Sequence, residues 1–154
     1  MRKIDALLIE YGESHTNPAN KRFHWVCIPV IMFSLMGLLM AIPMPFELPV
    51  YVNWATVFMF FALLYYIRLS FKIFIGFLPI VWMMLWGNIK ILETYGSKKL
   101  VIISLILFIV AWIGQFIGHN IEGKKPSFFK DLQFLLIGPA WLLHFIYKKA
   151  GIIY

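Results

Sequence analysis

The chain alternates long hydrophobic runs with short polar segments, a pattern that predicts membrane-spanning helices. Four runs come close to the length of a bilayer crossing, which is about 20 apolar residues. They cover residues 25–42, 52–67, 71–89 and 100–121. Within lipid, a helix satisfies every backbone polar group inside one segment. We therefore expect an all-α integral membrane helical bundle with four spans, forming a single membrane domain over residues 1–154.

Both ends of the chain carry shorter helical patterns. Residues 4–15 repeat apolar side chains at helical spacing with charges elsewhere, which predicts an amphipathic interfacial helix with His15 at its end. Near the other end, Gly138 and Pro139 break the apolar residues 132–147. We interpret this stretch as a C-terminal half-helix, and a fifth span is the alternative.

A helix start is expected between the amphipathic helix and the first span. Asn17 is a good N-cap, and proline is favoured at the first helical position, so the new helix should begin at Pro18. Asn20 and His24 then lie one turn apart on the same helix face.

The composition supports a membrane protein. The chain is 62% hydrophobic and 14% charged, whereas soluble domains are about half apolar and a quarter charged. A soluble domain of 154 residues has too small an interior to bury so much apolar surface. The one cysteine, Cys27, excludes an internal disulfide and a cysteine-rich metal site.

The net charge of +7 is carried by segments between the hydrophobic runs. Membrane proteins keep their topological signals in such segments, so we expect membrane lipids as the partner and no nucleic acid. With the N-terminus inside, most lysines and arginines are cytoplasmic, and only Lys90, Lys98 and Lys99 lie opposite. The candidate site residues described next then face the cytoplasm.

The first group with candidate chemistry is His15 and His24, on either side of the helix start at Pro18. Neutral imidazole is a common ligand of transition metals, so both rings could point at one ion. The alternative is a polar linker in which two histidines lie at the membrane interface by chance.

The second group lies at the end of the fourth predicted span. Gln115, His119 and Glu122 have the i, i+4, i+7 spacing of one helix stripe. Polar groups within a span indicate a functional site, and Gln115 lies a full turn deeper than His119. The alternative is a helix end that emerges into water. Gly114 and Gly118 form a small-x-x-x-small pattern, which favours close helix packing.

Together the groups offer three histidines and a carboxylate, a set that suits a non-haem iron site with open positions. The fourth histidine, His144, lies in the last apolar stretch and fits a buried structural histidine better. The chain has no zinc-protease, phosphate-loop or nucleophile-elbow motif.

Two separated motifs also resemble a known family. The first comprises Tyr11, His15, Asn17, Pro18, Asn20, His24 and Pro29, and the second comprises residues 115–119 and 122–126. Both resemble the signatures of the membrane family typified by the fungal 2-hydroxy fatty acid dioxygenase, and residues 135–139 are similar to its closing portion. The resemblance implies Fe(II) bound by His15, His24 and His119, with Glu122 as a further candidate ligand.

The function expected by this resemblance is an Fe(II)-dependent dioxygenase that shortens a long-chain 2-hydroxy fatty acid by one carbon with O₂. No organic cofactor is implied. The expected location is the inner membrane of a bacterium or the endoplasmic reticulum of a eukaryote. The alternative is a non-catalytic membrane protein, either a small transporter or a lipid-binding scaffold.

Overall fold

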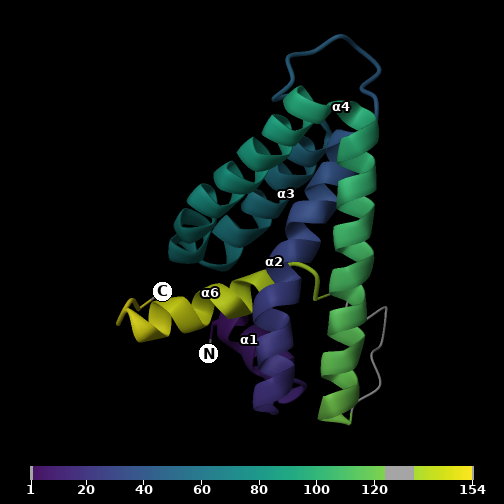
Figure 1. Ribbon diagram of the computed structural model, residues 1–154. Helices are drawn as coiled ribbons and strands as arrows, with labels where there is room; N and C mark the ends of the chain where they lie inside the picture. Colours follow the sequence, from purple (N-terminus) through teal and green to yellow (C-terminus); the bar gives the residue numbers. More distant parts are fainter. Residues whose placement is uncertain (1, 124–133, 154) are drawn as a thin grey trace.

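The computed structural model describes residues 2–123 and 134–153, and all regular elements in these ranges are α-helices. The all-α prediction is therefore confirmed for the described residues. The helices are α1 (Lys3–Glu13), α2 (Pro18–Met40), α3 (Trp54–Leu69), α4 (Phe71–Glu122) and α6 (Ile137–Lys149) (Figure 1).

α4 folds back on itself and so consists of two arms, residues 71–95 and 97–122 (Figure 1). Gly96 forms the turn with φ 78° and ψ 167°, a conformation that glycine adopts without the steric penalty of a Cβ atom. The sequence predicted two separate spans here, over residues 71–89 and 100–121. Both helices extend beyond these predicted ends, because the turn needs only one glycine.

α2 packs against the second arm of α4, and small residues bring the two helices close together. A Cβ atom built on Gly114 would lie 2.6 Å from the Cys27 sulfur, and one on Gly118 would lie 2.5 Å from the Asn20 amide oxygen. Side chains at either glycine would push the helices apart. The close packing predicted from the small-x-x-x-small pattern is present.

Two helices, α2 and α4, are long and apolar enough to cross a membrane. α3 is a shorter apolar helix of 16 residues. α6 has 13 residues, which at about 1.5 Å per residue gives about 20 Å, less than the roughly 30 Å of a bilayer core. α6 also lies crosswise to α2 (Figure 1), an arrangement that suits a half-helix better than a fifth span.

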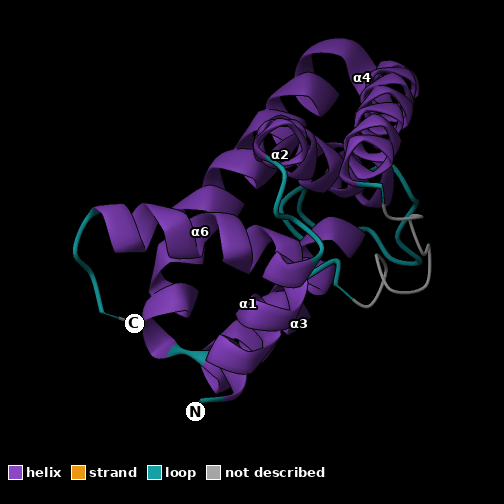
Figure 2. Cartoon of the chain, turned by 90° about the horizontal axis from the view of Figure 1, so that it is seen from below, coloured by secondary structure: helices purple, strands orange, loops and turns teal. Residues whose placement is uncertain are grey.

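α1 and α6 contact each other at the end of the bundle where α2 begins and α4 ends (Figures 1 and 2). α1 buries Ile4, Leu8 and Tyr11, as its amphipathic pattern predicts. It ends at Glu13, however, and the predicted helix over residues 4–15 is too long. His15 therefore lies in the connection to α2, where its backbone is free of helical geometry.

The reading of Gly138 and Pro139 as a break inside the last apolar stretch is wrong. Both residues lie in the first turn of α6, which begins at Ile137. Proline is compatible with a first turn because the amide hydrogen that it lacks has no partner there. Residues 132 and 133 of the predicted stretch lie outside the described residues.

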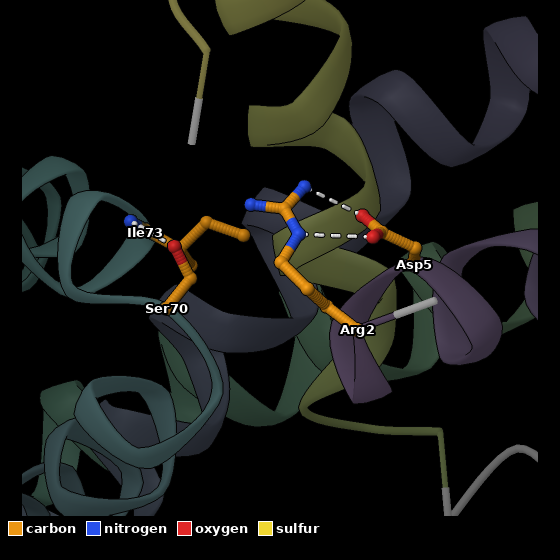
Figure 3. Close-up of polar contacts among 4 residues, drawn as sticks. All are labelled: Arg2, Asp5, Ser70 and Ile73. Carbon is orange, nitrogen blue, oxygen red and sulfur yellow. Dashed lines mark hydrogen bonds and ion pairs between the residues drawn. The ribbon is translucent and has the colours of Figure 1, made fainter.

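Local hydrogen bonds set the helix starts. The Asn17 side chain accepts from the Ala19 amide at 2.8 Å, which confirms the predicted start of α2 at Pro18. The Ser70 hydroxyl accepts from the Ile73 amide at 3.4 Å and caps α4 (Figure 3). The same view shows the Arg2 guanidinium donating to the Asp5 carboxylate at the start of α1.

Candidate metal centre

Three histidines that are far apart in the sequence meet where α1, α2 and α4 converge. His15 comes from the connection between α1 and α2, His24 from α2, and His119 from the last turn of α4. One ring nitrogen of each lies within 4.8 Å of the other two. The residues are 3%, 1% and 7% exposed, so the three imidazoles are shielded from water.

The hydrogen bonds of two of these rings fix which nitrogen carries hydrogen. Nδ1 of His15 lies 2.6 Å from the Tyr11 carbonyl oxygen, and Nδ1 of His24 lies 3.0 Å from the Asn20 carbonyl oxygen. A carbonyl oxygen only accepts, so each Nδ1 must donate. In the neutral imidazoles the two Nε2 atoms then carry lone pairs. Histidines that bind metals are held in this way, with the second nitrogen donating to a carbonyl or carboxylate.

These two Nε2 atoms face each other at 2.8 Å. Two lone pairs at that distance repel unless a proton or a metal cation lies between them. A proton would turn one ring into a buried imidazolium, and an isolated buried charge is costly. A metal cation shared by the rings removes the repulsion and uses both lone pairs.

The donor set indicates the kind of metal that fits. Imidazole suits zinc, copper, iron and nickel, whereas calcium and magnesium prefer oxygen ligands. Within the described residues, the group of candidate ligands contains the three histidines and no carboxylate. Three protein ligands leave coordination positions for water or substrate, as in catalytic metal sites.

Aromatic rings hold His15 in place. The Tyr11 ring stacks on it at 4.2 Å between centroids and 13° between planes. Trp141 of α6 lies 5.3 Å away, and it also contacts the Tyr11 ring edge to face at 5.4 Å. α6 thus helps to fix a ring that a connecting segment alone would leave mobile.

Glu122 lies outside the histidine group and joins α4 to the start of α2. Its carboxylate accepts from the amides of Thr16 at 2.8 Å and Asn17 at 2.9 Å, from the Asn20 side chain at 3.0 Å, and from the Thr16 hydroxyl. Burial alone would raise the pKa of Glu122, but these hydrogen bonds outweigh it and lower the pKa to about 2. The ionised carboxylate also suits the positive N-terminal end of α2.

This arrangement gives Glu122 a positioning role. It holds Thr16, the neighbour of His15, and Asn20, whose carbonyl oxygen orients His24. The ligand role predicted from the sequence stays a prediction, because both carboxylate oxygens already accept hydrogen bonds here. His144 lies elsewhere on α6, beside Phe145, and outside the group.

We expect Glu122→Gln to weaken metal binding about tenfold while the protein stays folded. The amide keeps one accepting oxygen but loses the charge that holds several donors, and loss of a supporting group typically weakens a site about 10–100-fold. Metal titration of the purified variant measures the effect, and Glu93→Gln, an exposed carboxylate paired with Lys90, is the matched control. Affinity equal to wild type would contradict the positioning role. Complete loss of metal would make Glu122 a ligand.

A cavity opens beside the histidines between α2, α4 and the start of α6. His24 and His119 contribute to its wall, together with the amide of Gln115. The remaining wall is mostly apolar, with Ile28, Ile31, Met32, Trp112, Phe134, Leu135 and Pro139 among its residues. A mostly apolar pocket with a few convergent polar groups is the usual form of a small-molecule site.

A second apolar cavity adjoins the first. Met32, Leu135 and Pro139 line both, and the second extends between α2, α3 and the first arm of α4 towards Tyr66 and Phe77. Both cavities are lined mostly by apolar residues, and only the first of them reaches the histidines.

Sequence reasoning found the three histidines and also named Tyr11, Asn20 and Glu122, but it did not predict their supporting contacts, and it missed Trp141. Trp141 had no visible signal, because its contact with His15 depends on how α6 crosses α2. The carbonyl partners of the rings were in principle visible, since Tyr11 and Asn20 each precede a histidine by four residues.

Residues 1–150 match a family model described as 2-hydroxy-palmitic acid dioxygenase Mpo1-like. The match covers both histidine motifs and the five helices of the described residues. No curated protein and no solved structure gave a significant match.

Proposed function

The chain belongs to the Mpo1-like family of 2-hydroxy-palmitic acid dioxygenases, and from this premise we propose that it is an Fe(II)-dependent dioxygenase. Its substrate is a long-chain 2-hydroxy fatty acid, which it shortens by one carbon. The observation that carries the proposal is the buried histidine group, in which two Nε2 lone pairs face each other at 2.8 Å beside an apolar cavity.

In this proposal His15, His24 and His119 hold the iron. Bound Fe(II) supplies the one-electron chemistry that allows O₂ to react with a closed-shell acid. The reaction balances as one 2-hydroxy acid and one O₂ giving the shorter acid, CO₂ and water. O₂ takes all the electrons released when the bonds of C2 to C1 and to its hydrogen break, so no other reductant is needed.

The protein's own residues bind and orient the acid. The cavity beside the histidines receives the polar head, and its apolar wall accepts the first carbons of the chain. The adjoining cavity shares Met32 and Leu135 with the first but measures only about 20 Å³, so in this proposal the surrounding helices move apart to take the rest of the tail. Burial of the histidines keeps bulk water away from the reacting carbon.

The membrane arrangement that fits this role has four crossings, through α2, α3 and the two arms of α4, with the histidines on the cytoplasmic side. α3, at about 24 Å, crosses with local thinning of the bilayer. An amphiphilic acid can then stay in the lipid while its head reaches the metal.

Product analysis tests the proposal. Protein purified in mild detergent, supplied with Fe(II), air and 2-hydroxypalmitate, is expected to form the fatty acid one carbon shorter, identified by mass spectrometry. A transporter or lipid-binding scaffold would return the acid unchanged. Recovery of intact 2-hydroxypalmitate from metal-loaded protein would contradict the dioxygenase.

A further inference from the structure

Gln115 is a buried amide that the site described so far does not use. It lies one helical turn before His119 on α4 and is 6% exposed. Its side chain lines the cavity that His24 and His119 also line. Among the described residues, its amide oxygen has no hydrogen-bond partner.

An unpaired amide oxygen destabilises a protein, because the group loses its water without replacing it. A methionine or leucine at this position would fill similar space without that penalty. The wall residues Ile28, Ile31 and Met32 offer no donor. Tyr11 and Trp112 on the same wall carry donor groups, but neither is bonded to this oxygen. Among the described residues, the Gln115 oxygen is therefore an acceptor that no donor satisfies, close to the histidines that would hold the metal.

The chemistry of the acid identifies a donor that fits. The ionised carboxylate of a fatty acid only accepts hydrogen bonds, and its alkyl chain offers none. A 2-hydroxy fatty acid has one donor near its head, the hydroxyl on C2. A plain fatty acid of the same length would leave the Gln115 oxygen unpaired.

We propose that Gln115 selects 2-hydroxylated acids over plain fatty acids, because its amide oxygen accepts a hydrogen bond from the substrate's 2-hydroxyl. The inference rests on the proposed function and deepens it by assigning a specificity residue. Sites built to pair with a hydroxyl discriminate strongly against analogues that lack it, since a buried polar group is then left unpaired.

Binding without turnover tests this role. Fe(II)-loaded protein under nitrogen is titrated with 2-hydroxypalmitate and with palmitate, for the wild type and for Gln115→Met. We expect the preference for the hydroxylated acid to fall about tenfold in the variant, chiefly through weaker binding of 2-hydroxypalmitate. Ile117→Met, on the exposed side of the same helix, is the control and should keep the preference.

Two results would overturn the inference. One is an unchanged preference in Gln115→Met. The other is an equal loss of affinity for both acids, which would mean that the amide holds the carboxylate or only supports the cavity. Metal content equal to wild type in the variant shows that the histidine group is intact.

Failure of this inference differs from failure of the proposed function. If the wild type shortens 2-hydroxypalmitate and Gln115→Met keeps the preference, the dioxygenase stands and the role of Gln115 does not. If the preference depends on Gln115 but no product ever forms, the selective site stands and the dioxygenase does not.

Discussion

Replacing any one of His15, His24 and His119 by alanine is expected to remove nearly all bound metal. Each ring supplies one of three nitrogens that lie within 4.8 Å of one another, and no carboxylate of the described residues joins the group. Loss of a ligand should therefore weaken affinity by more than the roughly 100-fold seen at most for a supporting group. Metal analysis of purified variants, normalised to protein, measures the effect.

His144→Ala is the matched control, because His144 lies on α6 outside the group. Its metal content should equal that of the wild type. Full metal occupancy in the three single variants would contradict the ligand assignment. Loss of metal in His144→Ala would mean that the site extends further along α6.

Some features of the fold could be predicted because their causes are local. The start of α2 depends on Asn17 and Pro18, which are adjacent in the sequence, and the prediction was correct there. The turn in α4 was not located. The predicted spans ended at residue 89 and began again at residue 100, yet Lys90 and Glu93 pair at 2.7 Å and the helix continues to the turn at Gly96.

The last apolar stretch shows why a Gly-Pro pair in a sequence is an ambiguous signal for where a helix begins or ends. Gly138 and Pro139 can break a helix or begin one, and only the position of the preceding residues decides between these roles. In the fold they belong to the first turn of α6, whose direction is set by its contacts with α1 and α2. No pattern within residues 132–147 contains that information.

For the candidate site too, the features with local causes could be predicted, whereas those that depend on helix packing could not. The spacing of Gln115, His119 and Glu122 placed them on one stripe of one helix, and the structure keeps them at the end of α4. Which of them turns toward His15 and His24 depends on packing between α2 and α4. As a result, His119 and Gln115 line the cavity, while Glu122 joins the two helices.

The second large effect expected is a strict dependence of turnover on metal and oxygen. Chelation of Fe(II) should abolish product formation, because the histidines alone cannot activate O₂. Adding Fe(II) back should restore it, whereas zinc, which has no redox chemistry, should occupy the site and leave it inactive. Zinc that restores full activity would exclude a redox role for the bound metal.

Oxygen dependence tests the central claim most directly. Fe(II)-reconstituted wild type and His119→Ala are incubated with 2-hydroxypalmitate under O₂ and under nitrogen, and the shortened acid is quantified by mass spectrometry. The proposed dioxygenase predicts product only from the wild type under O₂, with loss of substrate matching the product formed. Equal product under nitrogen would contradict the dioxygenase, and equal product from His119→Ala would contradict an iron centre held by these histidines.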